Sequence, residues 1–403
     1  MSAETSRIRS IGTSGAELIE VELQIGSKSH HVYFRSSDMI LTGNIEAFLA
    51  LALLPSMKEG GALVADGKAS QRFLDAMDTI LDIYCAWDSS LHRVQIGNVV
   101  PVTRDCPKEG RVGTFFTGGV DSFYTLLKHR DEITDLIFVH GFDVLLENYS
   151  LRRKTSEMIH KIGANFGKRV IEVETNLRSF LDSYFRLSWG TLTFGVGLVS
   201  VGHLLFPFFK KIYIPGTHTY ADLVPLGSHP LLDPLWSTET LEFVHDGCEA
   251  KRIDKVALLS EYDIALQSLR VCFFNINGAY NCGQCEKCLR TMINLHVVGA
   301  LDRCPTFDTR LDIKRVSKII VSDDSTRIFI KENLKALENR KGDLKLYKVL
   351  GKILNRPPWQ ARVITKHRRI KGRLKRLASK LLRIHQVLQW TNHTSKDLTN
   401  RST

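Results

Sequence analysis

Residues 113–127 read Gly-Thr-Phe-Phe-Thr-Gly-Gly-Val-Asp-Ser-Phe-Tyr-Thr-Leu-Leu and predict a strand, a glycine turn and a helix in direct succession. Gly118 and Gly119 let the backbone turn tightly and approach a ligand, because neither residue carries a Cβ. The N–H groups of the turn and the start of the helix then favour an anion such as phosphate. The turn contains no lysine, so it differs from the GxxxxGK[ST] loop. The alternative is an ordinary turn with Asp121 as helix N-cap.

From Arg111 onward, strand and helix patterns alternate. Strand patterns cover residues 112–116, 135–140, 169–173 and 211–215, and helical patterns cover residues 121–128, 150–166 and 177–209. The alternation predicts an α/β fold with a parallel, doubly wound sheet and helices on both faces. Such sheets bind ligands beyond the carboxyl ends of their strands. The segments expected at those ends are residues 117–122, 141–143, 174–176 and 216–222.

Several side chains near these strand ends are candidates for contacts with a ligand. The loop itself offers Thr117, Gly118, Gly119, Val120, Asp121 and Ser122. The fourth strand is followed by Gly216, Thr217, His218, Tyr220 and Asp222, which we expect to face the crevice. A loop flanked by prolines, residues 225–234, could act as a lid and carries His229 and Asp233.

The eight cysteines are unevenly placed. Four of them, Cys272, Cys282, Cys285 and Cys288, lie within seventeen residues and can close a tetrahedral shell around Zn²⁺. A closed site of four thiolates is structural, because it leaves no position for water. The alternative is a group of buried or free thiols, which is also the expected state of Cys85, Cys106, Cys248 and Cys304. The clustering favours a reducing cytoplasm.

The loop, the strand end at Gly216 and the cysteine pattern together resemble the PP-loop ATP pyrophosphatases, and within them the 7-cyano-7-deazaguanine synthase (QueC-like) branch. The SGGxDS loop of that family appears as Thr117–Ser122, with Thr in place of Ser. Its zinc pattern appears as Cys272 followed by Cys282, Cys285, Cys288 and the basic Arg290. Trp236-Ser237 also resembles a segment of the family. The resemblance covers about residues 111–301.

The resemblance implies a PP-loop (HUP-like) fold that binds ATP with Mg²⁺ and exposes the α-phosphorus to a carboxylate or carbonyl oxygen. AMP and pyrophosphate would leave, and a nitrogen nucleophile, or sulfur in the thiolating relatives, would displace AMP. Asp121 and Ser122 are the catalytic candidates, Asp121 through Mg²⁺ or the loop and Ser122 through pyrophosphate. The family places adenosine near His140, Gly141 and Asp143. A cysteine carries sulfur in the thiolating relatives, which makes Cys248 a minor candidate.

We expect four parts in the 403 residues: a small α+β unit (1–105), the ATP-binding domain (106–300, with zinc at 272–288), a helical connector (301–350) and a basic tail (351–403). Residues 16–25 and 31–35 predict a hairpin. Residues 45–54 predict a helix that Pro55 should end or bend, and Ser70 should cap a helix reaching Trp87. The glycine-rich uncharged run 187–209 is interpreted as a buried helix and not as a membrane span.

The net charge of +12 comes from the C-terminal tail, where residues 352–383 hold twelve Lys or Arg and no acid. Apolar residues spaced by three and four predict a basic amphipathic helix over residues 360–390, followed by a polar end. The tail could bind nucleic acid, anionic lipid or an acidic partner, or it could be a solvated helix. Two alternatives to a ligase therefore stay open, an RNA-modifying enzyme of the same fold and a non-catalytic nucleotide- and zinc-binding module. Homo-oligomerisation is left open too.

Overall fold

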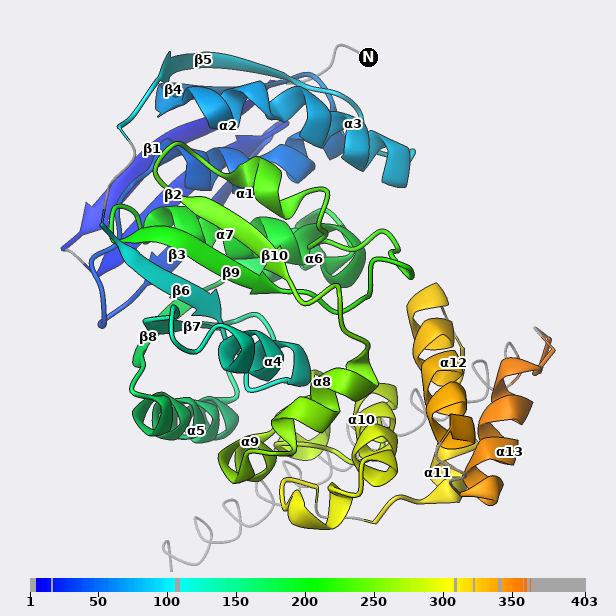
Figure 1. Ribbon diagram of the computed structural model, residues 1–403. Coiled ribbons are helices and arrows are strands. Elements are labelled where there is room, and N and C mark those ends of the chain that lie inside the picture. Colours follow the sequence, from blue (N-terminus) through cyan, green and yellow to red (C-terminus); the bar gives the residue numbers. More distant parts are fainter. Residues whose placement is uncertain are drawn as a thin grey trace, which may run out of the picture.

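The computed structural model describes residues 5–15, 17–105, 109–307, 310–321, 323–339, 343–357, 359–360 and 363. These residues build a single ten-stranded sheet with helices packed against it (Figure 1). The strand order is β10-β9-β6-β7-β8-β3-β2-β1-β4-β5. The bounds are β1 (Ser6–Ser14), β2 (Leu18–Ile25), β3 (Lys28–Arg35), β4 (Ala62–Ser70), β5 (Gln95–Val102), β6 (Arg111–Phe115), β7 (Asp135–His140), β8 (Arg169–Thr175), β9 (Phe209–Pro215) and β10 (Glu242–Asp246).

One half of the sheet is the parallel block that the sequence predicts. Strands β10, β9, β6, β7 and β8 run parallel to one another. The four predicted strands of this region are confirmed with bounds that differ by two residues at most. The sequence does not predict β10, because its five residues contain only Phe243 and Val244 as apolar side chains.

The other half of the sheet comes from the N-terminal residues. The predicted hairpin is confirmed as β2 and β3, which pair antiparallel. Strand β3 also pairs with β8 through Phe34 opposite Thr175 and Arg35 opposite Glu174. The N-terminal strands therefore extend the sheet of the parallel block.

Helices cover both faces of the parallel block. On β7, Ile137 and Val139 belong to one apolar core, and Leu136 and Phe138 belong to the other. The first core includes residues of α1, α2, α3, α6, α7 and the N-terminal strands, and the second includes residues of α4, α5, α8, α9, α10, α12 and α13. The bounds are α1 (Ile45–Glu59), α2 (Gln71–Asp75), α3 (Met77–Trp87), α4 (Val120–Lys128), α5 (Tyr149–Phe166), α6 (Leu177–Tyr184), α7 (Phe194–Leu204), α8 (Arg252–Leu259), α9 (Asp263–Ser268), α10 (Glu286–Val297), α11 (Ile313–Val316), α12 (Asp324–Asn339) and α13 (Leu344–Leu354).

Some predicted helix boundaries are wrong. Helix α1 does not end at Pro55 but continues to Glu59, because its residues 45–57 are all buried and packing against α7 and β4 holds them. Ser70 caps a helix as predicted, by accepting a hydrogen bond from the N–H of Phe73. This helix is then interrupted at Ala76, so that α2 and α3 are separate.

The predicted helical region 177–209 is also not one helix. It consists of α6, a π-helical turn (Trp189–Thr193) and α7, and α7 ends at Leu204, before Pro207. A Cβ on Gly195 would lie 1.9 Å from the carbonyl oxygen of Gly227, so this glycine lets another chain segment approach closely. Among the described residues, we find no helix of the length and apolar character needed to cross a membrane.

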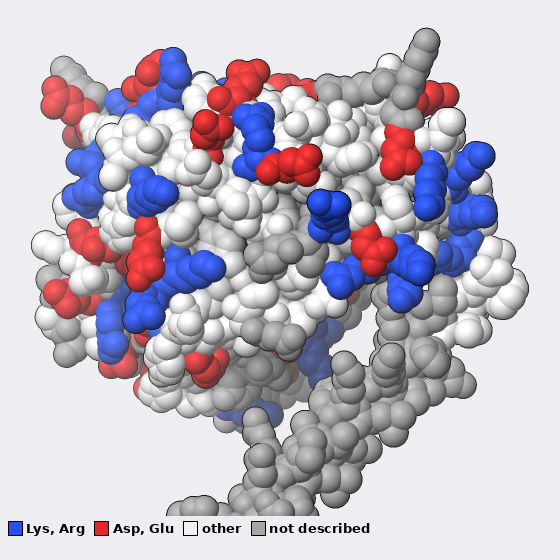
Figure 2. All heavy atoms as spheres, turned by 90° about the horizontal axis from the view of Figure 1, so that it is seen from below, with Lys and Arg blue, Asp and Glu red and all other residues white. Residues whose placement is uncertain are grey.

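The connector contains the helices α11, α12 and α13; α12 packs against α8 and α10, and α13 packs against α12 and α11 (Figure 1). Apart from residues 360 and 363, the predicted basic helix 360–390 and the polar end 391–403 lie outside the described residues. On the face seen from below, Lys and Arg are mixed with Asp and Glu on the left, and they gather with fewer acids on the right (Figure 2).

The turn after β7 requires glycine. Gly141 has a φ of +94°, and a Cβ there would lie 2.0 Å from the carbonyl oxygen of Thr175. We expect Gly141→Ala to lower the free energy of unfolding by about 3 kcal/mol, through left-handed strain and overpacking. Gly167→Ala is the matched control, because Gly167 has a φ of +64° and open space around it. Urea unfolding should show that Gly167→Ala lowers the free energy of unfolding by only about 1 kcal/mol. An equal loss of unfolding free energy in both variants would contradict the steric argument.

Candidate functional site

The loop of residues 117–122 joins β6 to α4 at the carboxyl edge of the parallel block. Gly118 has a φ of +71°, and Gly119 is the N-cap of α4. The backbone N–H of Gly119 donates to the hydroxyl of Ser122 at 3.0 Å. Asp121 is the second residue of α4, so the interpretation of Asp121 as N-cap is wrong. Its carboxylate is left for other contacts.

Asp121 lies among buried cations. The guanidinium of Arg252 is 3.3 Å from its carboxylate, and the ammonium of Lys255 is 3.7 Å away. Burial raises the pKa of Asp121, but the charges of Arg252, Lys255, Lys287 and Arg290 outweigh burial and hold this pKa below its usual value. Asp121 is therefore ionised at neutral pH.

The cations come from three segments that meet at the loop. Arg252 and Lys255 lie on α8, Lys287 and Arg290 on α10, and Arg270 follows α9. The backbone N–H of Arg270 donates to the carbonyl of Gly118 at 2.8 Å, which places Arg270 against the loop. Arg252, Lys255, Arg270 and Arg290 are all buried.

Positive charge exceeds negative charge in this cluster. Among the described residues, the acids that interact with this cluster include Asp121, Asp143, Glu286 and Glu332. Burial raises the pKa of Glu332, which favours its neutral form. Burying an unpaired cation costs several kcal/mol, so this arrangement favours an anionic ligand. Among the described residues, the Nε–H groups of Arg252 and Arg270 have no hydrogen-bond partner.

The structure brings other predicted strand-end residues to the loop. The hydroxyl of Thr217 lies 3.4 Å from the carboxylate of Asp121. The carbonyl of Gly216 accepts a hydrogen bond from Lys255 at 2.7 Å. The turn at Gly141 is linked less directly, since Asn275 donates to the carbonyl of Asp143 and accepts from Arg270.

Helix α12 packs against the cationic cluster through Phe329 and Ser325. The guanidinium of Arg290 lies 3.8 Å from the ring centre of Phe329, and the ring of His218 stacks on the same residue at 5.1 Å. His218 also hydrogen-bonds to Ser325 at 3.0 Å. Burial, aided by the charge of Arg290, lowers the pKa of His218 to about 4, so this ring is neutral. Of the other candidates, Tyr220 is exposed and Asp222 accepts from Thr219.

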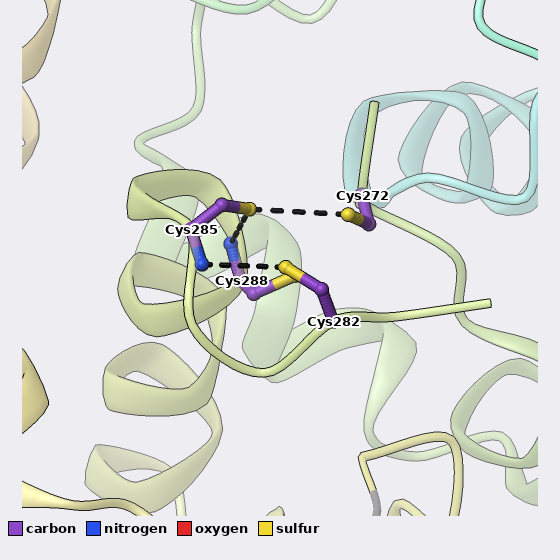
Figure 3. A group of neighbouring side chains, drawn as sticks. All are labelled: Cys272, Cys282, Cys285 and Cys288. Carbon is purple, nitrogen blue, oxygen red and sulfur yellow. Dashed lines mark hydrogen bonds between the residues drawn. The ribbon is translucent and has the colours of Figure 1, made fainter. Parts of the chain in front are cut away.

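The four clustered cysteines converge as predicted. Cys285 and Cys288 stand at the start of α10, and Cys272 approaches from the opposite side (Figure 3). Their Sγ atoms, with that of Cys282, all lie within 4.8 Å of one another. The 3.9 Å between Cys272 and Cys285 and the 3.8 Å between Cys282 and Cys288 fit the roughly 3.8 Å edge of a tetrahedron with bonds of about 2.3 Å. The cluster could hold a metal ion and is compatible with zinc.

The two candidate residues of the proline-flanked segment 225–234 point into the protein. His229 and Asp233 are both buried, and Asp233 accepts hydrogen bonds from Ser228 at 2.6 Å and from Nδ1 of His245 at 2.7 Å. Burial lowers the pKa of His245, but hydrogen bonds to Asp233 and Cys248 outweigh burial and raise it to about 9. His245 is therefore an imidazolium at neutral pH.

This ion pair predicts a pH dependence of stability. The pKa of His245 is higher in the folded chain than its ordinary 6.5. The stability that protonated His245 contributes is therefore complete below pH 6.5 and is lost as pH rises through 9. We expect the free energy of unfolding to fall by up to about 3 kcal/mol over this range. Urea unfolding at several pH values measures the slope, and Asp233→Asn should remove most of it. An unchanged slope in the variant would contradict the assignment.

No protein-family model, curated protein or solved structure matches the chain. Function is therefore inferred from the side chains of the site.

Sequence reasoning missed most of the cationic cluster. Only Arg290 was singled out, through the cysteine pattern, and Arg252, Lys255, Arg270 and Lys287 were not. The sequence does carry a signal for Lys287 as well as Arg290. These two residues are three apart on the helix that begins at the clustered cysteines, so they lie on the same helix face. The missing signal for Arg252 and Lys255 is β10, which directs α8 toward the loop. Of the remaining thiols, Cys248 and Cys304 are buried, Cys85 is half-buried, and Cys106 lies outside the described residues.

Proposed function

We propose that the chain is an ATP-dependent ligase of the PP-loop, QueC-like type that adenylates a carboxylate and releases pyrophosphate. The observation that carries this proposal is the convergence of five cations, four of them buried, on a glycine loop at a helix start. A lone glycine turn would suit any small anion. Five cations at one turn suit a polyphosphate, because several phosphate groups can share them.

The donor set fits ATP with Mg²⁺. The unpartnered Nε–H groups of Arg252 and Arg270 are donors that phosphate oxygens would satisfy. Asp121 would be the protein ligand of Mg²⁺, because this ion binds one or two carboxylates together with phosphate oxygens and water. The contacts of Asp121 with Arg252 and Lys255 are longer than strong ionic hydrogen bonds, so they leave its lone pairs available. Mg²⁺ would neutralise charge on the phosphates.

The chemistry follows from this arrangement. A substrate carboxylate oxygen attacks the α-phosphorus, and the bond to the β-phosphate breaks to give an acyl adenylate and pyrophosphate. The loop N–H groups and the Ser122 hydroxyl stabilise the departing pyrophosphate, and Lys255 and Arg252 balance its charge. A nitrogen nucleophile then displaces AMP. Zinc on the four cysteines would be structural, holding the start of α10 and thereby Lys287 and Arg290.

Nucleotide binding tests the proposal. Calorimetric titration with Mg²⁺ and a non-hydrolysable ATP analogue should show one site per chain, and Arg252→Gln should weaken the affinity by about tenfold or more. Arg303→Gln is the matched control, since Arg303 is half-exposed and pairs with Asp263. Its affinity should be unchanged, and circular dichroism checks the fold of both variants. Equal affinities in the two variants, or no binding by the unaltered chain, would refute the site.

A further inference from the structure

The connector presents a basic face to solvent. On α13, Lys345, Lys348 and Lys352 are spaced by three and four residues, so they share one helix face, and all three are exposed. Neither α11 nor α13 contains an acid. Among the described residues, no acid pairs with any of these three lysines. Their charges are therefore open to an anionic ligand.

Helix α11 adds to this charge. Arg356, which follows α13, donates hydrogen bonds to the carbonyls of Ser317 and Ile319 at 2.7 Å each, so the end of α13 is held against the end of α11. Lys and Arg gather with fewer acids on the right of Figure 2, which is the side where these helices lie in Figure 1. We name as the connector surface the five exposed cations Lys314, Arg315, Lys345, Lys348 and Lys352.

The spacing of the lysines on α13 suits a row of phosphates. Lys345 and Lys352 are seven residues apart, which on a helix is about 10 Å. A nucleic acid strand carries one phosphate per about 3.4 Å of its axis, so about three phosphates span this distance. Tyr347 and Trp359, in the same part of the chain, expose aromatic rings on which bases can stack.

A lipid surface suits α13 less well. A helix that lies on a membrane buries an exposed apolar face among the lipids. The apolar side chains Leu346, Leu350 and Ile353 of α13 are instead buried within the protein, where α13 packs against α12 and α11. The face that α13 turns to solvent carries a row of charges, which favours a hydrophilic polyanion.

The sequence continues this charge beyond α13. Residues 352–383 hold twelve Lys or Arg and no acid. Because Lys352 lies on α13 itself, the basic segment of the sequence begins at the connector surface. A long polyanion could neutralise both.

We propose that the connector surface binds nucleic acid through its phosphate backbone, without reading the base sequence. This inference goes beyond the proposed ligase and does not depend on it. Helix α13 packs against α12, and Phe329 of α12 contacts Arg290. Helix α12 therefore links the connector surface to the candidate site.

Salt-dependent binding of RNA tests the surface. The full chain is titrated into a short fluorescein-labelled RNA of mixed sequence, and anisotropy gives Kd between about 50 and 200 mM salt. Each phosphate contact on a single strand contributes about 0.7 to the steepness of log K against log salt concentration. The triple variant Lys345→Gln, Lys348→Gln, Lys352→Gln should lower this steepness by about 2 and weaken binding by about tenfold or more at about 100 mM salt.

The matched control changes three exposed cations of another helix. Arg153→Gln, Lys154→Gln and Lys161→Gln together remove the same net charge from α5. This variant should bind RNA with the affinity and salt dependence of the unaltered chain. Circular dichroism checks the fold of both triple variants.

Three results would overturn the proposal. The first is an unaltered chain that does not bind the RNA, and the second is an equal loss of affinity in the two triple variants. The third comes from sedimentation with vesicles of phosphatidylcholine and phosphatidylserine. Vesicle binding that needs the three lysines of α13, together with RNA binding that does not, would assign the surface to a membrane. ATP is absent throughout, so the result does not depend on the proposed adenylation.

Discussion

Replacing Asp121 by Asn is expected to lower the rate of ATP-dependent pyrophosphate release by about 100-fold or more, with the fold intact. The amide has nearly the shape of the carboxylate but lacks its charge, so it cannot hold Mg²⁺ as a carboxylate does. It also leaves Arg252 and Lys255 without the acid that they contact at 3.3 and 3.7 Å. An enzyme-coupled pyrophosphate assay measures the rate, with a panel of carboxylates supplied as acceptors.

Asp131→Asn is the control for this experiment, because Asp131 is almost fully exposed and pairs only with Arg130 among the described residues. Its rate should equal that of the unaltered chain. Thermal unfolding of both variants separates loss of function from loss of structure. A rate in Asp121→Asn within about twofold of the unaltered chain would contradict the assigned chemistry of the loop.

Replacing Cys285 by Ser is expected to remove the bound metal and to lower the free energy of unfolding by about 3 kcal/mol or more. Cys285 is the N-cap of α10, and its Sγ accepts the N–H of Cys288 at 3.4 Å as well as lying 3.9 Å from Cys272. Its loss opens the tetrahedral shell and loosens the start of the helix that carries Lys287 and Arg290. Elemental analysis for zinc and urea unfolding measure the two effects.

Cys304→Ser is the matched control, because Cys304 is buried but its thiol contacts Leu266 and Thr306 instead of the cluster. It should retain the metal. If Cys285→Ser binds as much zinc as Cys304→Ser, the four cysteines are not the metal site.

The parallel block and the cysteine cluster could be predicted because their signals are local. Two glycines between an apolar strand pattern and an amphipathic helix pattern predict the loop at residues 117–122. The cysteines that converge are close in sequence, so their spacing alone indicates a shared ion. Burial on both faces makes β7 a continuous apolar run, which is readable without its neighbours.

The remaining features depend on contacts between distant segments. The pairing of β3 with β8 joins the N-terminal strands to the sheet through residues about 140 apart, and no local pattern encodes it. Pro55 predicts a helix end, but burial of α1 on all sides overrides it. The contact of Arg252 with Asp121 requires β10 to be in place, and the pairing of Asp233 with His245 requires the fold of segment 225–234.

In the proposed function, the loop and its cations present the α-phosphate of ATP for attack. Incubation with Mg²⁺, α-labelled ATP and a panel of carboxylates, followed by separation of the labelled products, tests this claim most directly. We expect the label in the acyl adenylate or in AMP released from it, with an equal amount of pyrophosphate, and about 100-fold less of these products in Asp121→Asn. Labelled ADP, or ATP left intact by the unaltered chain, would contradict it.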